Sequence, residues 1–96
     1  MPTLTVSPQS AHEVRPLLQS ALNNERQVIQ AGIHQTELRL RQFECQFGRT
    51  TAEFLRQYDA EQLEETLEYD DWIGESRLLS RRQNQLTTLR DLRIEN

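Results

Sequence analysis

One apolar stripe with helical spacing runs through the first half of the chain and constrains its fold more than any other feature. Nine side chains fall within a sector of about 100°, the width expected of one buried helical face. They are Val14, Leu18, Leu22, Ile29, Ile33, Thr36, Leu40, Phe43 and Phe47. The stripe predicts a helix of about 35 residues, roughly 50 Å long. A helix of that length needs another element beside it to cover the stripe.

The residues after this stripe contain signals for the end of one helix and the start of another. Gly48 tolerates the left-handed backbone conformation that closes a helix. Thr50, followed three residues later by Glu53, has the spacing of a capping box. We therefore expect a long helix over residues 10–47 and a short helix over residues 50–58.

A second apolar stripe predicts a returning helix over residues 67–93, with Thr66 as its N-cap. Its apolar positions are Trp72, Leu78, Leu79, Leu86 and Leu89. A helix of this length can lie antiparallel along the first one, which gives a long helical hairpin with a short elbow helix. Because Trp72 lies near the turn, we expect its ring to be buried against aromatic residues such as Phe43, Phe47 and Phe54.

The composition agrees with an all-α fold in a single domain. Of the 96 residues, 35% are hydrophobic, 27% are charged and three are glycine, which favours long helices over sheet. A monomer of this composition buries a thin core. We therefore expect a partner or a second copy of the chain to complete the core.

The first nine residues, 1–9, are expected to form an extended or disordered arm. Polar and apolar residues alternate from Thr3 to Val6, as in a strand. Since a lone strand is unstable in water, the arm is either a frayed terminus or a strand added to the sheet of another chain. In the second case Leu4 and Val6 would contact the partner. Ser10 then caps the long helix.

Two residues interrupt the long stripe. Glu25 is either a side chain that reaches water from the edge of the stripe or a buried acid paired with an arginine of the returning helix. The axial position in a hairpin favours Arg82 as that arginine. Gly32 costs about 1 kcal/mol relative to alanine in a helix interior, so we expect another backbone to cross closely there.

Eight acidic residues follow the short helix, with no basic residue among them. They are Asp59, Glu61, Glu64, Glu65, Glu68, Asp70, Asp71 and Glu75. The rest of the chain has eleven arginines and seven acids, so the net charge of −4 conceals a dipolar sequence. The dipole of a helix capped by Thr66 accounts for Glu68, Asp70 and Asp71. The acids before Thr66 have no such structural reason.

No residue pattern indicates catalysis, a cofactor or a metal. His12 and His34 lie on different helical faces, and neither has partners at metal-ligand spacing. Cys45 is expected to be a small core residue rather than a nucleophile, because Phe43 and Phe47 flank it and no histidine follows it. The three glycines do not form a phosphate-binding loop. We expect a protein that is not an enzyme.

The sequence also predicts a cytoplasmic protein. A single cysteine cannot form an internal disulfide, and the N-terminal residues lack the apolar core of a signal peptide. No apolar run approaches the ~20 residues that span a bilayer.

The turn and the acidic segment resemble a family of short helical proteins of cyanobacteria and archaea that are encoded beside TumE-type toxins. The motif is Phe43-Glu44-x-x-Phe47-Gly48-x-Thr50-Thr51-x-Glu53-Phe54-x-x-x-Tyr58, the acidic spacer, and Tyr69-Asp70-Asp71-Trp72-x-Gly74-Glu75. The match covers about residues 38–89, with Phe47 where the family often has tyrosine. The resemblance implies the antitoxin of a type II toxin-antitoxin pair, with the cognate toxin as its partner.

Toxins of this kind generally act on RNA and need a positive groove for phosphates. We expect the apolar helical face to bind the toxin and the acidic segment to complement its charge. The acids concerned are Glu61, Glu64, Glu65, Glu68, Asp70 and Asp71. The alternative is a self-assembling helical dimer that acts as a structural module without a toxin. DNA binding would need the arginines of the last helix, which are Arg77, Arg81, Arg82, Arg90 and Arg93.

Overall fold

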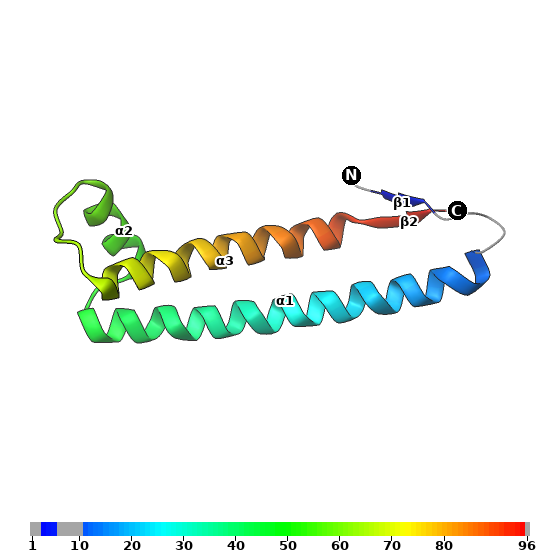
Figure 1. Cartoon of the computed structure of the whole chain (residues 1–96), viewed down its shortest axis with the longest axis horizontal. Helices are drawn as coiled ribbons and strands as arrows, with labels where there is room; N and C mark the ends of the chain where they lie inside the picture. The colour runs from blue at the N-terminus through cyan, green and yellow to red at the C-terminus, as the bar shows by residue number, and fades with distance from the viewer. Residues whose placement is uncertain (1–2, 6–10, 96) are drawn as a thin grey trace. The chain divides into compact units, whose positions relative to one another are not determined.

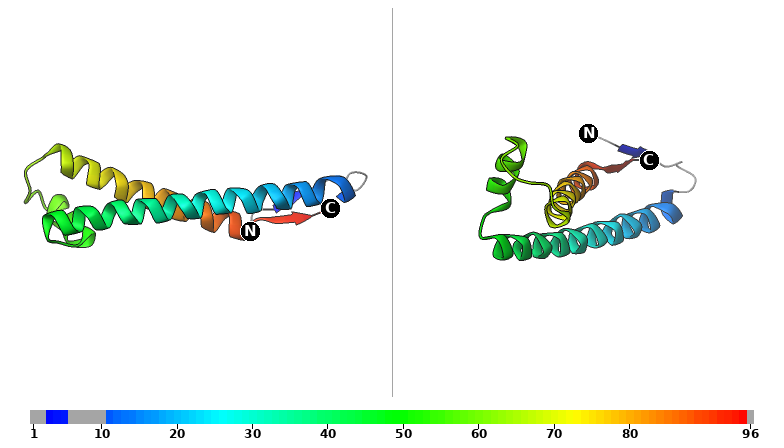
Figure 2. Two further views of the ribbon diagram at one scale, coloured as in Figure 1. Left: turned by 90° about the horizontal axis from the view of Figure 1, so that it is seen from below. Right: turned by 60° about the vertical axis from the view of Figure 1, so that its left-hand side comes forward.

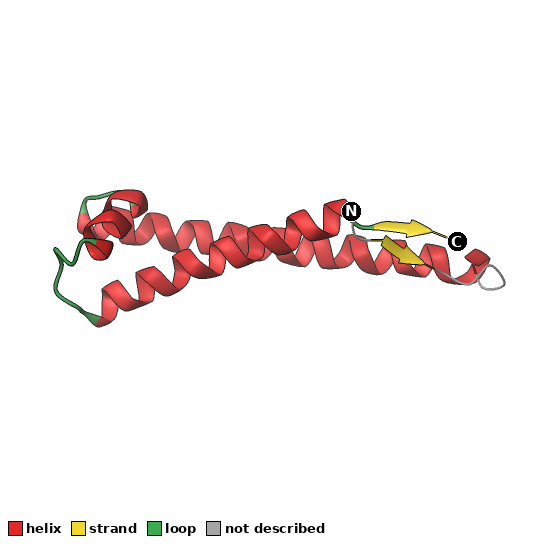
Figure 3. Cartoon of the chain, turned by 90° about the horizontal axis from the view of Figure 1, so that it is seen from above, coloured by secondary structure: helices red, strands yellow, loops and turns green. Residues whose placement is uncertain are grey.

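The fold is a helical hairpin, as the two apolar stripes predicted (Figure 1). The computed structural model describes residues 3–5 and 11–95. Helices account for most of this part of the chain (Figure 3). The elements in order are β1 (Thr3–Thr5), α1 (Ala11–Phe47), α2 (Thr51–Asp59), α3 (Leu67–Asp91) and β2 (Arg93–Glu95). Helices α1 and α3 are the two arms of the hairpin, and α2 is the short helix of the elbow.

Two compact units share the long helices. The first contains the two strands, α1 as far as Gly32, and α3 from Arg82 onward. The second is Ile33–Arg81, which contains the rest of α1, the whole of α2 and the first part of α3. The main cluster of buried apolar side chains belongs to the second unit.

The stripe predicted on α1 is confirmed. All nine of its side chains are buried or half-buried, although the helix is 37 residues long and mostly exposed elsewhere. The five apolar positions predicted on α3 are likewise buried or half-buried. Ser10, the predicted N-cap of α1, lies outside the described residues.

The predicted turn between α1 and α2 is also confirmed. Gly48 has a φ of 67°, and its N–H donates to the carbonyl oxygen of Glu44 over 2.9 Å. The hydroxyl of Thr50 accepts a 3.1 Å hydrogen bond from the N–H of Glu53. The carboxylate of Glu44 accepts a second one, 2.7 Å long, from the N–H of Thr51. These two bonds satisfy the N–H groups of Thr51 and Glu53, which have no partner inside the helix. Helix α2 then runs in a direction that crosses that of α1 (Figure 2).

The C-terminal end of α2 is closed by a Schellman motif. The N–H of Gln62 donates to the carbonyl oxygen of Gln57, and that of Glu61 donates to Tyr58, each over 3.0 Å. This motif places Glu61 at a φ of 57°, in the left-handed region that glycine usually occupies.

Helix α3 begins as predicted but ends earlier. The hydroxyl of Thr66 accepts a 3.1 Å hydrogen bond from the N–H of Tyr69, which confirms Thr66 as the N-cap. The helix ends at Asp91 rather than at residue 93. Arg93 belongs to the strand β2 instead, because the chain extends after Leu92 to pair with β1.

Trp72 lies at the centre of the buried cluster, as predicted. Its indole ring and the Phe54 ring are both 0% exposed. The centroid of the indole lies 5.6 Å from those of Phe43 and Phe47. Its Nε1–H donates a 3.0 Å hydrogen bond to the hydroxyl of Thr51, so the buried polar atom of the ring is satisfied.

The described part of the N-terminal arm is extended, as expected, but neither of the two arrangements expected for it was correct. Residues Thr3–Thr5 are neither a frayed end nor a strand on another chain, because β1 pairs in parallel with β2 of the same chain. The two strands lie side by side (Figures 1 and 3). Leu4 is opposite Ile94 in their register. The expectation for Val6 concerns a residue outside the described part of the chain.

The predicted pair between Glu25 and Arg82 does not form. Glu25 is exposed, whereas the guanidinium of Arg82 donates a 2.7 Å hydrogen bond to the carbonyl oxygen of Gly32. A Cβ on Gly32 would lie only 2.9 Å from the guanidinium carbon of Arg82. The group that approaches Gly32 closely is therefore the side chain of Arg82, and not a crossing backbone as expected.

Cys45 is exposed, so the expectation that it is a core residue was also wrong. Phe43 and Phe47 point into the core, but a residue two positions away from each of them points to the opposite side of a helix.

Candidate acidic binding surface

The acidic residues predicted to bind a partner all lie at the surface of the second unit. Each of the six has an exposed side chain: Glu61, Glu64, Glu65, Glu68, Asp70 and Asp71. Within the described residues none of them forms an ion pair. The ion pair seen in this unit joins Arg39 to Glu75 instead, with a nitrogen–oxygen distance of 3.8 Å. The acidic segment is therefore exposed and has no opposite charge paired with it within the described chain.

Part of this segment has a structural role. Glu68 and Asp70 lie in the first turn of α3, where carboxylates interact favourably with the positive end of the helix dipole. This position explains the presence of two exposed carboxylates without any binding role. The acids that precede α3 are the stronger candidates for binding.

The structure brings three of the preceding acids around one hollow. Its volume is about 370 Å³, and it is lined by Tyr58, Asp59, Glu61, Leu63 and Glu65. Glu64 and Asp71 are exposed outside this hollow. Carboxylates accept hydrogen bonds and cannot donate them when ionised, so a guanidinium or an ammonium group is the complementary ligand. Among the described residues, no group of three or more acids, histidines or cysteines has the geometry of a metal site.

The Schellman motif shapes this hollow. Because Glu61 adopts the left-handed conformation, the chain reverses directly after α2, and Leu63 packs against the buried cluster. Tyr58 and Asp59 at the end of α2 then face the residues after the reversal. The charges are evident in the sequence, but the hollow is not, since no glycine marks this turn.

The exposure of Leu67 is a second feature that the sequence did not predict. Its side chain is 81% exposed, and it is the first residue of α3. It stands between Glu65 and Glu68 in the sequence. The other apolar residues near the elbow, such as Phe43 and Phe47, are already packed against Trp72. The apolar surface that remains for a partner beside the acids is therefore Leu67, and not the inner stripe of α1.

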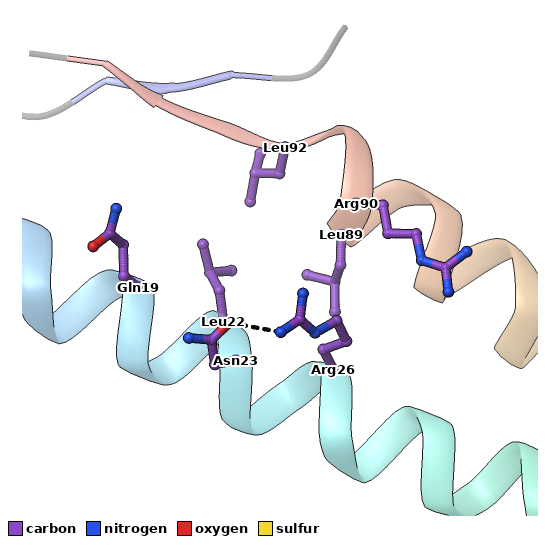
Figure 4. Close-up of a pocket in the computed structure, with 7 residues that line it drawn as sticks. All are labelled: Gln19, Leu22, Asn23, Arg26, Leu89, Arg90 and Leu92. Carbon is purple, nitrogen blue, oxygen red and sulfur yellow. Dashed lines mark hydrogen bonds between the residues drawn. The ribbon is translucent and has the colours of Figure 1, made fainter.

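The first unit contains a hollow of a different character (Figure 4). Its volume is about 430 Å³, and it is lined by Gln19, Leu22, Asn23, Arg26, Leu89, Arg90 and Leu92. The guanidinium of Arg26 donates a 3.1 Å hydrogen bond to the side-chain oxygen of Asn23. The Arg90 guanidinium extends along α3 and away from the leucines (Figure 4). The two charges do not converge on one point, so the hollow lacks the geometry of an anion site.

The arginines considered for DNA binding are dispersed. Arg77 and Arg81 are exposed one helical turn apart on α3. Arg82 is half-buried and bonded to Gly32, and Arg93 belongs to β2. Two neighbouring arginines do not form a basic recognition helix.

No helix of the described chain is long and apolar enough to cross a membrane. No family model, curated protein or solved structure matches the chain. Membership of the antitoxin-like family therefore stays a prediction from the motif around the elbow.

Proposed function

We propose that this chain is an antitoxin-like binding protein that neutralises a basic cognate toxin through its acidic segment. The observation that carries the proposal is the hollow lined by Asp59, Glu61 and Glu65. Its three carboxylates have no ion pair within the described residues. A partner that inserts a basic side chain there would place a positive charge beside these carboxylates.

Charge also supports a basic partner at longer range. The unit Ile33–Arg81 contains eleven acids and six arginines. A surface with one dominant sign of charge accelerates the encounter with a partner of opposite sign and disfavours partners of the same sign. A toxin groove that binds RNA phosphates is such a partner.

The exposed Leu67 supplies the apolar contact. Interfaces draw most of their binding energy from a few buried side chains, while charged groups at the rim govern the association rate. Leu67 is 81% exposed beside the acids, so its burial in a complex removes apolar surface from water. The proposed contact thus has one apolar anchor and a ring of carboxylates.

The test uses the product of the small gene adjacent to the one that encodes this chain. Expression of that product alone should arrest growth of a bacterial host, and coexpression of this chain should restore growth. With the purified pair, the double variant Glu61→Gln and Glu65→Gln should lower the association rate constant by about tenfold at low salt and flatten its salt dependence. Leu67→Ala should mainly raise the dissociation rate constant.

The matched control removes two exposed acids elsewhere, with Glu53→Gln and Asp91→Asn. These variants change the net charge equally but leave the hollow intact, so the association rate should fall far less. Equal effects of the two pairs would assign the attraction to net charge alone. Absence of a small neighbouring gene, or growth arrest that this chain does not relieve, would contradict the antitoxin function.

A further inference from the structure

A second series of residues on α1 has spacings of four and three residues in strict alternation. The series is Leu17, Ala21, Asn24, Val28, Ala31, Gln35, Leu38, Gln42 and Cys45. All nine side chains are exposed, and none is charged. In a chain in which 27% of the residues are charged, α1 thus has an uncharged outer face in addition to its buried stripe. We call these nine residues the outer seam.

The alternation of four and three gives a period of 3.5 residues, which is the period of a two-stranded coiled coil. The described chain has four exposed large apolar residues. Three of them belong to the outer seam: Leu17 is 70% exposed, Val28 is 64% exposed and Leu38 is 43% exposed. The spacing on this side of α1 is therefore typical of a helix that packs against a second helix in a coiled coil.

We propose that the outer seam binds the same seam of a second copy of this chain, with the two α1 helices antiparallel. One alignment matches three pairs of residues by chemical type. It sets Val28 against Leu38 of the second copy, Asn24 against Gln42, and Ala21 against Cys45. The remaining pair of the seam, Ala31 against Gln35, is not matched in type, and Leu17 faces no seam residue. Large apolar groups thus meet each other, the amides hydrogen-bond to each other, and the small residues meet where the helices are closest.

The charges that flank the seam favour the same alignment. Glu25 and Arg39 are both exposed and occupy equivalent flanking positions two heptads apart. When Val28 faces Leu38 of the second copy, Glu25 lies beside Arg39 of that copy, and symmetry creates this pair twice. Opposite charges at flanking positions set the orientation of a coiled coil. Arg39 also lies 3.8 Å from Glu75 in its own chain, with more than half of its side chain exposed.

A parallel alignment lacks these matches. It would place His34 beside Arg39 and Ser20 beside Glu25, so no pair of opposite charges forms across the seam. It would also bring the acidic segments that follow α1 to the same end, where they repel. An antiparallel pair holds them at opposite ends.

This inference does not rest on the proposed function. The outer seam shares no residue with the acidic hollow. The experiments below use this chain alone and need no toxin, so the two proposals can fail separately.

The first experiment measures mass by sedimentation equilibrium over a range of concentrations. The wild-type chain should pass from the mass of one chain to that of two as the concentration rises. Val28→Glu places a charge in the middle of the seam and should weaken dimerisation by at least about tenfold. Gln30→Glu is the matched control, since position 30 is exposed on the other side of α1. It should leave the dimer unchanged.

Circular dichroism must show equal helix content in both variants. A wild-type chain that stays monomeric at all concentrations, or a Val28→Glu variant that dimerises like Gln30→Glu, would overturn the outer seam as an interface.

The second experiment determines orientation with disulfides under mild oxidation. Ala21→Cys should give a covalent dimer linked between position 21 of one copy and Cys45 of the other. Within one chain these positions lie about 36 Å apart along a single helix, far beyond disulfide reach. The variant that combines Ala21→Cys with Cys45→Ser should cross-link much more slowly. Efficient Cys45-to-Cys45 linkage in the wild-type chain would show a parallel dimer and contradict the proposed alignment.

A charge exchange checks the alignment independently. Glu25→Arg or Arg39→Glu alone should weaken the dimer, and the double exchange should restore it. Failure of the double exchange to improve on either single variant would overturn the register.

Discussion

The indole ring of Trp72 stacks on the phenyl ring of Phe54 with their centroids 3.9 Å apart and their planes inclined by 4°. Both side chains are 0% exposed. Because Phe54 comes from α2 and Trp72 from α3, this contact attaches the elbow helix to the hairpin. The stability of the second unit therefore depends strongly on one aromatic pair.

Trp72→Ala should destabilise the chain by about 3 to 5 kcal/mol, through lost apolar contacts, a cavity, and a Thr51 hydroxyl left without its donor. Denaturation followed by far-ultraviolet circular dichroism measures this loss. Leu67→Ala is the control, because an exposed residue should change the unfolding free energy by less than about 0.5 kcal/mol. The single tryptophan of the wild-type chain should have the blue-shifted emission of a buried indole, and emission typical of an exposed indole would contradict the packing.

Gly32→Ala should stabilise the chain less than Gly74→Ala does. Both changes raise helix propensity by about 1 kcal/mol. At position 74 a new Cβ meets nothing within 4 Å, whereas at position 32 it meets the guanidinium carbon of Arg82 at 2.9 Å. The arginine must then move and weaken its hydrogen bond to the Gly32 carbonyl oxygen.

A double-mutant cycle isolates this effect. In an Arg82→Ala background, Gly32→Ala should recover its full gain of about 1 kcal/mol, since the obstructing side chain is absent. An equal effect of Gly32→Ala in both backgrounds would show that Arg82 does not require the glycine.

Glu61→Gly should stabilise the chain by about 1 kcal/mol, because glycine adopts the left-handed conformation at this position without a Cβ penalty. The φ of Glu61 is 57°. Thermal unfolding measures the gain. Glu61→Ala removes the same charge but keeps the Cβ, so it should stabilise far less. If alanine stabilises as much as glycine, the gain comes from reduced repulsion among the acids and not from the backbone.

The sequence determined most of the helical architecture. The stripes on α1 and α3 repeat every turn, and the caps at Gly48, Thr50 and Thr66 act over three or four residues. Such signals are local, so they can be read from residue spacing. The burial of Trp72 could also be predicted from the sequence, because a large aromatic side chain on the apolar stripe of a helix near the turn packs into the core.

The tertiary structure decided the pairings between distant residues. Leu4 pairs with Ile94 from the opposite end of the chain, and no periodicity near either residue indicates that partner. Arg82 reaches Gly32 instead of Glu25 because a long flexible side chain can reach several positions on a facing helix, and only packing selects one.

The candidate site shows the same division. The charge of the acidic segment was evident from the sequence, but its concave form depends on a reversal at Glu61, where the usual glycine is absent. Spacing along the chain determines which face of a helix a residue occupies. Only the folded chain determines which acids surround one hollow and that Leu67, next to them in the sequence, stays exposed. Both depend on where the loop and the start of α3 lie.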